Sequence, residues 1–101
     1  MRTFPKDFYW GAATASYQVE GGIENCDWAE AAREGRVPVC GDACDHFNRY
    51  EADFDLAKEL GHNAHRFALE WARIEPEEGK FDEAAIEHYR QVIGALKKRD
   101  I

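Results

Sequence analysis

The hydrophobic positions of this chain change their spacing several times, and each change marks a predicted element. A short run of aromatic and small residues predicts a buried strand over residues 9–13. Apolar residues recurring every three or four positions predict helices over residues 45–60 and 82–99. Between these helices, apolar and polar residues alternate and predict a second strand over residues 63–71. The order strand, helix, strand, helix indicates an α/β fold with parallel strands and right-handed crossovers.

The segment between the first strand and the first long helix is irregular, because glycine and proline interrupt it repeatedly. Within it, residues 27–33 predict a short helix that Asp27 caps. Asp45 is expected to cap the helix over residues 45–60, and Gly61 to end that helix in a left-handed conformation. Residues 74–79 are predicted to form a turn. These signals place the element boundaries but not yet any chemistry.

Composition narrows the possible classes of protein. The 101 residues are 45% hydrophobic and 33% charged, as in a soluble globular protein. No apolar run approaches the roughly 18 residues of a membrane helix, and the first seven residues lack the apolar core of a secretory signal. A cytoplasmic location without membrane contact is therefore expected. The formal net charge of −7 and the scattered basic residues argue against nucleic acid as a partner.

Three cysteines and one histidine form a possible metal set: Cys26, Cys40, Cys44 and His46. Their spacing does not match the paired knuckles of common zinc sites. The prediction is therefore free thiols and no metal, with a small zinc-binding module as the alternative.

Gln18 is the first candidate for binding chemistry. It follows the first predicted strand, and its amide offers two donors and an acceptor without charge. Such a group suits a hydroxyl-rich ligand, which means a sugar. The alternative is that Gln18 bonds the backbone of its own loop, since most side-chain hydrogen bonds go to backbone or water.

Three blocks of the chain together resemble family 1 glycoside hydrolases, the β-glucosidase family. They occur in the family's order and spacing, and they cover nearly all of the chain: Phe4-Pro5 with Phe8-Tyr9-Trp10-Gly11-Ala12-Ala13-Thr14-Ala15-Ser16-Tyr17-Gln18-Val19-Glu20-Gly21; Asp53, Leu56 and Leu60-Gly61 with Asn63-Ala64-His65-Arg66-Phe67-Ala68-Leu69-Glu70-Trp71-Ala72-Arg73-Ile74-Glu75-Pro76; and Gly79-Lys80-Phe81-Asp82 with Ile86 and Tyr89. One short motif would be weak evidence, whereas three collinear motifs are specific.

The resemblance implies an eight-stranded (β/α)8 barrel, a fold of about 250 residues. Residues 1–101 would then be the N-terminal portion of a single barrel domain, namely its first two β/α units, with a third strand starting near Ile101. Two parallel strands leave open edges and one uncovered face. We therefore expect the chain by itself to be a fragment that is marginally stable or aggregates.

The resemblance also implies hydrolysis of β-glucosides or related small-molecule glycosides with retention and without a cofactor. The family's two catalytic glutamates come from a Thr-x-Asn-Glu-Pro motif and a Glu-Asn-Gly motif, and neither occurs here. Glu24-Asn25 and Glu75-Pro76 have the wrong neighbours. The chain alone is therefore predicted to be inactive. The alternative is a degenerate, non-catalytic chain that binds a sugar or a partner protein; the sequence does not indicate an oligomeric state.

Two residues match functional positions of the family. Gln18 matches the glutamine that hydrogen-bonds sugar hydroxyls. Arg66 matches the arginine that supports the nucleophile carboxylate, and the alternative for this mid-strand cation is an ion pair with Glu70 or another acid of the barrel. Glu70 lies near the end of its strand, but the matching family position is not the acid/base, so a structural role is predicted for it.

Overall fold

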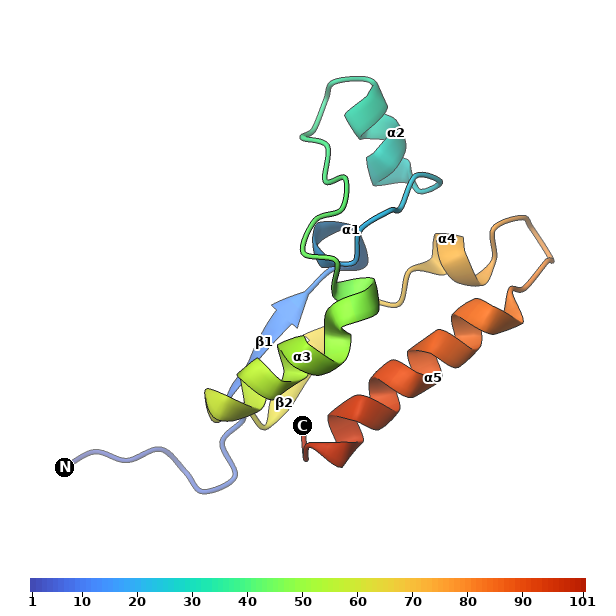
Figure 1. Ribbon diagram of the computed structural model, residues 1–101. Coiled ribbons are helices and arrows are strands. Elements are labelled where there is room, and N and C mark those ends of the chain that lie inside the picture. Colours follow the sequence, from blue (N-terminus) through green and yellow to red (C-terminus); the bar gives the residue numbers. More distant parts are fainter.

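The computed structural model describes residues 1–101 and consists of two β/α units (Figure 1). The predicted alternation of strand, helix, strand and helix is confirmed. Single-turn helices, which are too short to show a period in the sequence, follow each strand. The elements are β1 (Gly11–Thr14), α1 (Ser16–Val19), α2 (Asp27–Arg33), α3 (His46–Glu59), β2 (Ala64–Phe67), α4 (Trp71–Ile74) and α5 (Glu83–Lys98).

The two strands form a parallel pair, with Gly11 opposite Ala64 and Thr14 opposite Phe67. Alternate residues of a strand point to opposite faces. Phe67 packs against the hydrophobic core, so its face of the sheet is covered by helices. Arg66 is on the opposite face and is exposed. One face of the sheet is thus covered and the other is open.

The core lies where α5 packs against α3 and α4. Phe54 of α3 is among its most buried members. The apolar repeat that predicts this helix is buried at Tyr89, Val92 and Leu96 of α5, whereas Ile93 is 39% exposed. The complete buried cluster is Phe54, Ile74, Ala85, Tyr89, Val92, Ala95 and Leu96.

Two predicted helix caps are wrong. Asp45 precedes α3 but has a left-handed backbone with φ 52° and makes no capping hydrogen bond, because its carboxylate accepts from Asn48 Nδ2 instead. The cap of α2 is Cys26, whose Sγ accepts from the Ala29 N–H at 3.4 Å, and Asp27 is already the first helical residue. The end of α3 is as predicted, since Gly61 has φ 83°.

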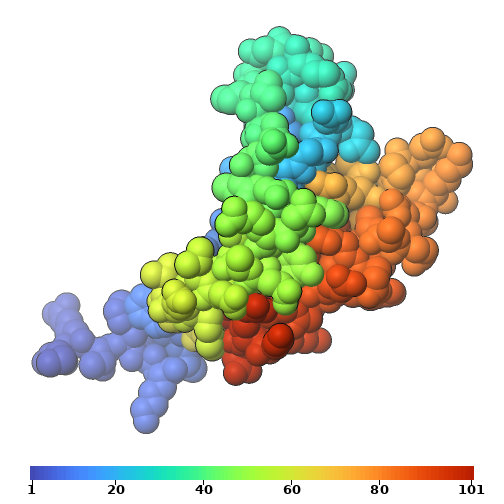
Figure 2. All heavy atoms as spheres, viewed as in Figure 1, coloured from blue at the N-terminus to red at the C-terminus, as the bar shows by residue number.

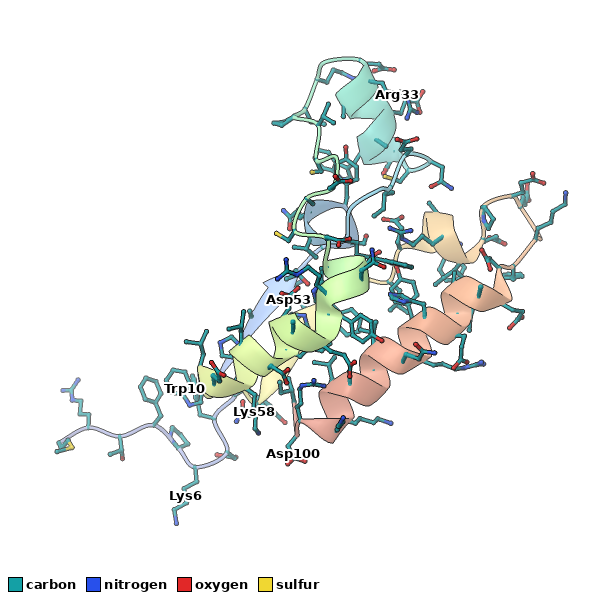
Figure 3. All side chains as sticks on the ribbon, viewed as in Figure 1. Lys6, Trp10, Arg33, Asp53, Lys58 and Asp100 are labelled. Carbon is teal, nitrogen blue, oxygen red and sulfur yellow. The ribbon has the colours of Figure 1, made fainter.

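Much of the apolar surface is uncovered. Only 14 of 101 residues are buried, and residues around α2 project away from the rest of the molecule (Figure 2). Trp10 lies at the start of β1, away from α5 (Figure 3), and is 46% exposed. No helix has the length and apolar character needed to cross a bilayer.

Candidate binding site at the ends of the two strands

The candidate site is built from the segments that follow β1 and β2. Because the strands are parallel, their carboxyl ends lie at the same edge of the sheet. The Ser16 hydroxyl, after β1, donates to Glu70 Oε2, after β2, at 2.6 Å. Both residues are buried. This bond joins the two segments across 54 positions of the sequence.

Gln18 lies on α1 at this edge and is exposed. It lines a hollow of about 520 Å³ together with Tyr17, Trp28 and Pro38. The Gln18 side-chain amide makes no hydrogen bond within the chain and can bind a ligand in the hollow, whereas the side chains of Ser16 and Glu20 are bonded to other parts of the chain. The structure does not show the alternative in which Gln18 bonds its own loop.

Arg66 occupies the open face of the sheet, next to Ala13 in register. Arg66 is exposed in this chain, because no further strand or helix covers that face. It also forms no ion pair with Glu70. Arg66 lies on the face of the sheet opposite the helices.

The Glu70 carboxylate is occupied within the chain. Oε2 accepts from Ser16, and Oε1 accepts from the Ala72 N–H at 3.2 Å, which caps α4. The side chain is buried, with 9% exposure for the residue. These contacts support the predicted structural role of Glu70.

Sequence reasoning missed a buried polar network around Glu20. The Glu20 carboxylate accepts from the Tyr89 hydroxyl at 3.0 and 2.9 Å and from Arg73 Nε at 2.9 Å. Tyr89 in turn accepts from the Glu70 N–H at 3.1 Å. The Arg73 guanidinium also donates to the Gly21 carbonyl at 2.7 Å and lies 4.2 Å from the centre of the Phe47 ring. We call Glu20, Arg73 and Tyr89 the Glu20 clamp.

Burial dominates the electrostatics of this clamp. It raises the pKa of Glu20 above its ordinary value, against the opposing hydrogen bond from Tyr89 and the charge of Arg73. Burial also raises the pKa of Tyr89, so the hydroxyl stays protonated and can donate. One signal in the sequence could have pointed here: Tyr89 lies in the apolar stripe of a helix, and a buried tyrosine hydroxyl needs a polar partner. The identity of that partner, 69 positions away, has no local signature.

The four possible metal ligands do not converge. Cys26 and Cys40 line the hollow beside Gln18, whereas Cys44 and His46 line another hollow, between the sheet and α3. His46 Nδ1 is 2.7 Å from Asp53 Oδ2. No three side chains of histidine, cysteine, aspartate or glutamate lie close enough together to hold a metal ion. The alternative zinc-binding module is therefore not formed in this structure.

Comparison with known proteins identifies the family. The model of glycosyl hydrolase family 1 matches residues 1–101. The chain belongs to glycosyl hydrolase family 1. It is 39% identical over 98% of its length to β-glucosidase A of Acetivibrio thermocellus, and 35% identical over its whole length to β-glucosidase A of Thermotoga maritima. A solved β-glycosidase from Pyrococcus horikoshii superposes on 97% of the chain with a TM-score of 0.88 and 42% identity.

Family membership explains the open face of the sheet. The chain spans about a quarter of the length of these relatives: 24% and 25% of the two β-glucosidases and 23% of the P. horikoshii chain. The predicted fold is confirmed, since the structure is the first two β/α units of a family 1 (β/α)8 barrel. In such a barrel the carboxyl ends of the strands form the active face. Gln18 and the Ser16–Glu70 bond lie at that end of β1 and β2.

Proposed function

We propose that the whole protein to which this chain contributes is a retaining β-glycosidase acting on β-glucosides or related small-molecule glycosides in carbohydrate metabolism. The family match over residues 1–101 and relatives named β-glucosidases support this. A T. maritima β-glucosidase that matches this chain at 35% identity has been solved in complex with a substituted glucoimidazole. We further propose that residues 1–101 form one continuous part of a single barrel domain.

Retaining hydrolysis needs two carboxyl groups about 5–5.5 Å apart. One glutamate protonates the departing oxygen, while the other attacks the anomeric carbon and forms a covalent glycosyl intermediate. Neither family motif for these glutamates occurs among the 101 residues. We therefore assign the chain a part of the sugar-binding wall, and we expect no hydrolysis from the chain alone.

Gln18 is assigned to sugar binding. The observation that carries this assignment is an exposed amide on a hollow of about 520 Å³, at the carboxyl end of β1 in a family 1 chain. A neutral donor and acceptor group can bind two neighbouring hydroxyls of a sugar at once. Apolar residues such as Trp28 and Pro38 line the same hollow.

Arg66 is assigned to the support of the nucleophile. It is a cation on the open face of the sheet without a partner in the chain. A carboxylate beside it would be held ionised, because a nearby positive charge lowers the pKa of an acid. An ionised carboxylate is the form that attacks the anomeric carbon.

The deciding experiment has two steps. The reading frame beyond Ile101 should contain the two missing glutamate motifs, and the protein it encodes should hydrolyse an aryl β-glucoside. In that protein, Gln18→Ala should lower kcat/KM for the glucoside by about 10-fold or more, because the hydrogen bonds between the amide and the sugar hydroxyls are lost. Unchanged kinetics would remove Gln18 from the site.

The second candidate is a non-catalytic chain that binds a sugar or a partner protein. A stop codon directly after Ile101 would favour it, because the product would lack both catalytic glutamates. The cytoplasmic location and the absence of a cofactor stay predictions from the sequence.

A further inference from the structure

We propose that Glu20 is a positioning residue, and that the Glu20 clamp holds the turn carrying Gln18 in the geometry that binds the sugar. This inference rests on the proposed function of Gln18. The clamp would act from behind the turn, through Gln18, without touching the substrate.

The geometry places Gln18 between two anchored positions. The turn begins at Ser16, whose hydroxyl is held by Glu70, and it ends at Glu20, whose carboxylate is held by Tyr89 and Arg73. The Glu20 N–H also donates to the Ser16 carbonyl at 2.9 Å, which closes the turn. Gln18 lies midway between these anchors and is itself exposed. Its position is therefore determined by its two neighbours.

All anchoring groups come from the second β/α unit. Glu70 follows β2, Arg73 belongs to α4 and Tyr89 belongs to α5. α1 alone is a single turn, too short to keep its shape without such contacts. The clamp thus fixes a binding residue of the first unit by the fold of the second.

The Tyr89 hydroxyl is the most informative group to remove. It is the sole protein donor to Glu20 Oε2, and Glu20 is only 5% exposed. Without the Tyr89 hydroxyl, this buried carboxylate oxygen has no hydrogen-bond donor. An unsatisfied buried oxygen lowers stability by more than an ordinary hydrogen bond contributes. The carboxylate can regain a partner by moving toward water, and this movement would carry the turn and Gln18 with it. Because phenylalanine keeps the ring, Tyr89→Phe removes the hydroxyl without creating a large cavity.

Gly21 limits how the turn can respond. Its φ is 87°, and a Cβ at this position would lie 2.3 Å from the Asp42 carbonyl oxygen. Arg73 also donates to the Gly21 carbonyl. The chain directly after the clamp is therefore held close to the loop before α3. We expect any displacement in a variant to be concentrated in residues 16–20.

The test is a double-mutant cycle on kcat/KM for an aryl β-glucoside, measured in the intact protein. Tyr89→Phe alone should lower kcat/KM by about 10-fold, mainly through KM. In a Gln18→Ala background the same change should lower it less than 2-fold, because the group that the clamp positions is already gone. Equal losses in both backgrounds would show a general structural role and would overturn the proposal. Glu20→Gln keeps the shape of the side chain and part of its hydrogen bonding to Arg73. It should lower kcat/KM by an intermediate factor, again only when Gln18 is present.

Tyr50→Phe is the matched control. Tyr50 also packs against Phe54 in the core, but it lies outside the clamp. Tyr50→Phe should leave kcat/KM unchanged in the wild-type and Gln18→Ala backgrounds. A loss equal to that of Tyr89→Phe would overturn the proposal.

A crystal structure of the Tyr89→Phe protein gives a readout that does not depend on activity. Displacement of residues 16–20 supports the proposal, and superposition within coordinate error contradicts it. If the wild-type protein hydrolyses no β-glycoside, the proposed function fails, while this comparison still decides whether the clamp positions the turn.

Discussion

The role that we propose for Arg66 depends on groups outside this chain. Its guanidinium lies on the open face of the sheet and makes no ion pair in the chain. Arg66→Met in the intact protein should lower kcat by at least about 10-fold, because the nucleophile loses the charge that keeps it ionised. The acid limb of the pH profile of kcat/KM should also shift to higher pH, since the pKa of the nucleophile rises.

A suitable control for Arg66→Met is Arg90→Met, which removes a cation that forms only an exposed pair with Glu87 at 3.3 Å. Steady-state kinetics across pH should show no change for this variant. An Arg66→Met profile that coincides with the wild type would exclude the assigned role.

His65 gives the fold a dependence on pH. Burial lowers its pKa below the ordinary 6.5, and the nearby His46 and His62 act in the same direction. The folded state thus binds the proton less well than the unfolded state. The stability that neutral His65 contributes is complete above about pH 6.5 and is lost as pH falls through the lower, folded-state pKa.

His65→Phe should therefore make the intact protein less sensitive to acid. The urea midpoints of wild type and variant, compared at about pH 7.5 and about pH 5, measure this. The wild type should lose more stability between the two conditions. The ring stacks on Phe67 at a centroid distance of 5.6 Å, so phenylalanine can keep that contact. Equal losses would show that His65 does not titrate in this range.

Gln18, which we propose to bind the sugar, and the Glu20 clamp differ in how far the sequence indicates them. Gln18 was found because it follows a strand and belongs to a family motif. The Glu20 clamp was missed because its members are 53 and 69 positions apart and show no local pattern. Long-range polar pairing of this kind is set by packing, which the order of residues does not display.

At the scale of elements, the length of the apolar repeat decides how well the sequence predicts where an element begins and ends. The helices α3 and α5 were placed within a residue at each end, since 14 and 16 residues give several turns of apolar repeat. β2 is shorter than predicted, because apolar residues continue through Leu69 after the pairing with β1 has ended. The sequence pattern predicts Trp71 as the end of that strand, but Trp71 begins α4 and is 60% exposed.

The N-cap of α5 is the element boundary with the clearest energetic consequence. Asp82 Oδ1 accepts from the N–H groups of Ala84 at 2.9 Å and Ala85 at 3.3 Å. Asp82→Ala should lower the free energy of unfolding by about 1 kcal/mol, because two donors of the first turn lose their partner. Asp82→Asn keeps an oxygen acceptor and should retain most of that stability. Urea unfolding of the intact protein measures both, and an equal loss in the two variants would argue against the cap.

At the scale of the whole molecule, the chain is an open structure. Its radius of gyration is 15.9 Å, compared with about 13 Å for a compact domain of 100 residues. Large apolar side chains remain exposed at the amino end of β1, where the rings of Phe4, Phe8 and Trp10 pack on one another at centroid distances of 4.6–4.8 Å. Such patches favour association. The resemblance to a barrel, and not the composition, was the signal that predicted this open face.

We expect the 101-residue chain on its own to self-associate and to unfold without a sharp transition. Two strands cannot close a sheet, and both edges retain unpaired backbone groups that can pair with another copy. Size-exclusion chromatography with light scattering should show oligomers whose size grows with protein concentration, and heating should give a broad change in circular dichroism. The intact barrel, measured in the same buffer, is the control and should melt cooperatively. A monomeric 101-residue chain with an equally sharp transition would mean that the two units form a sufficient core by themselves, and that the open face does not destabilise the chain.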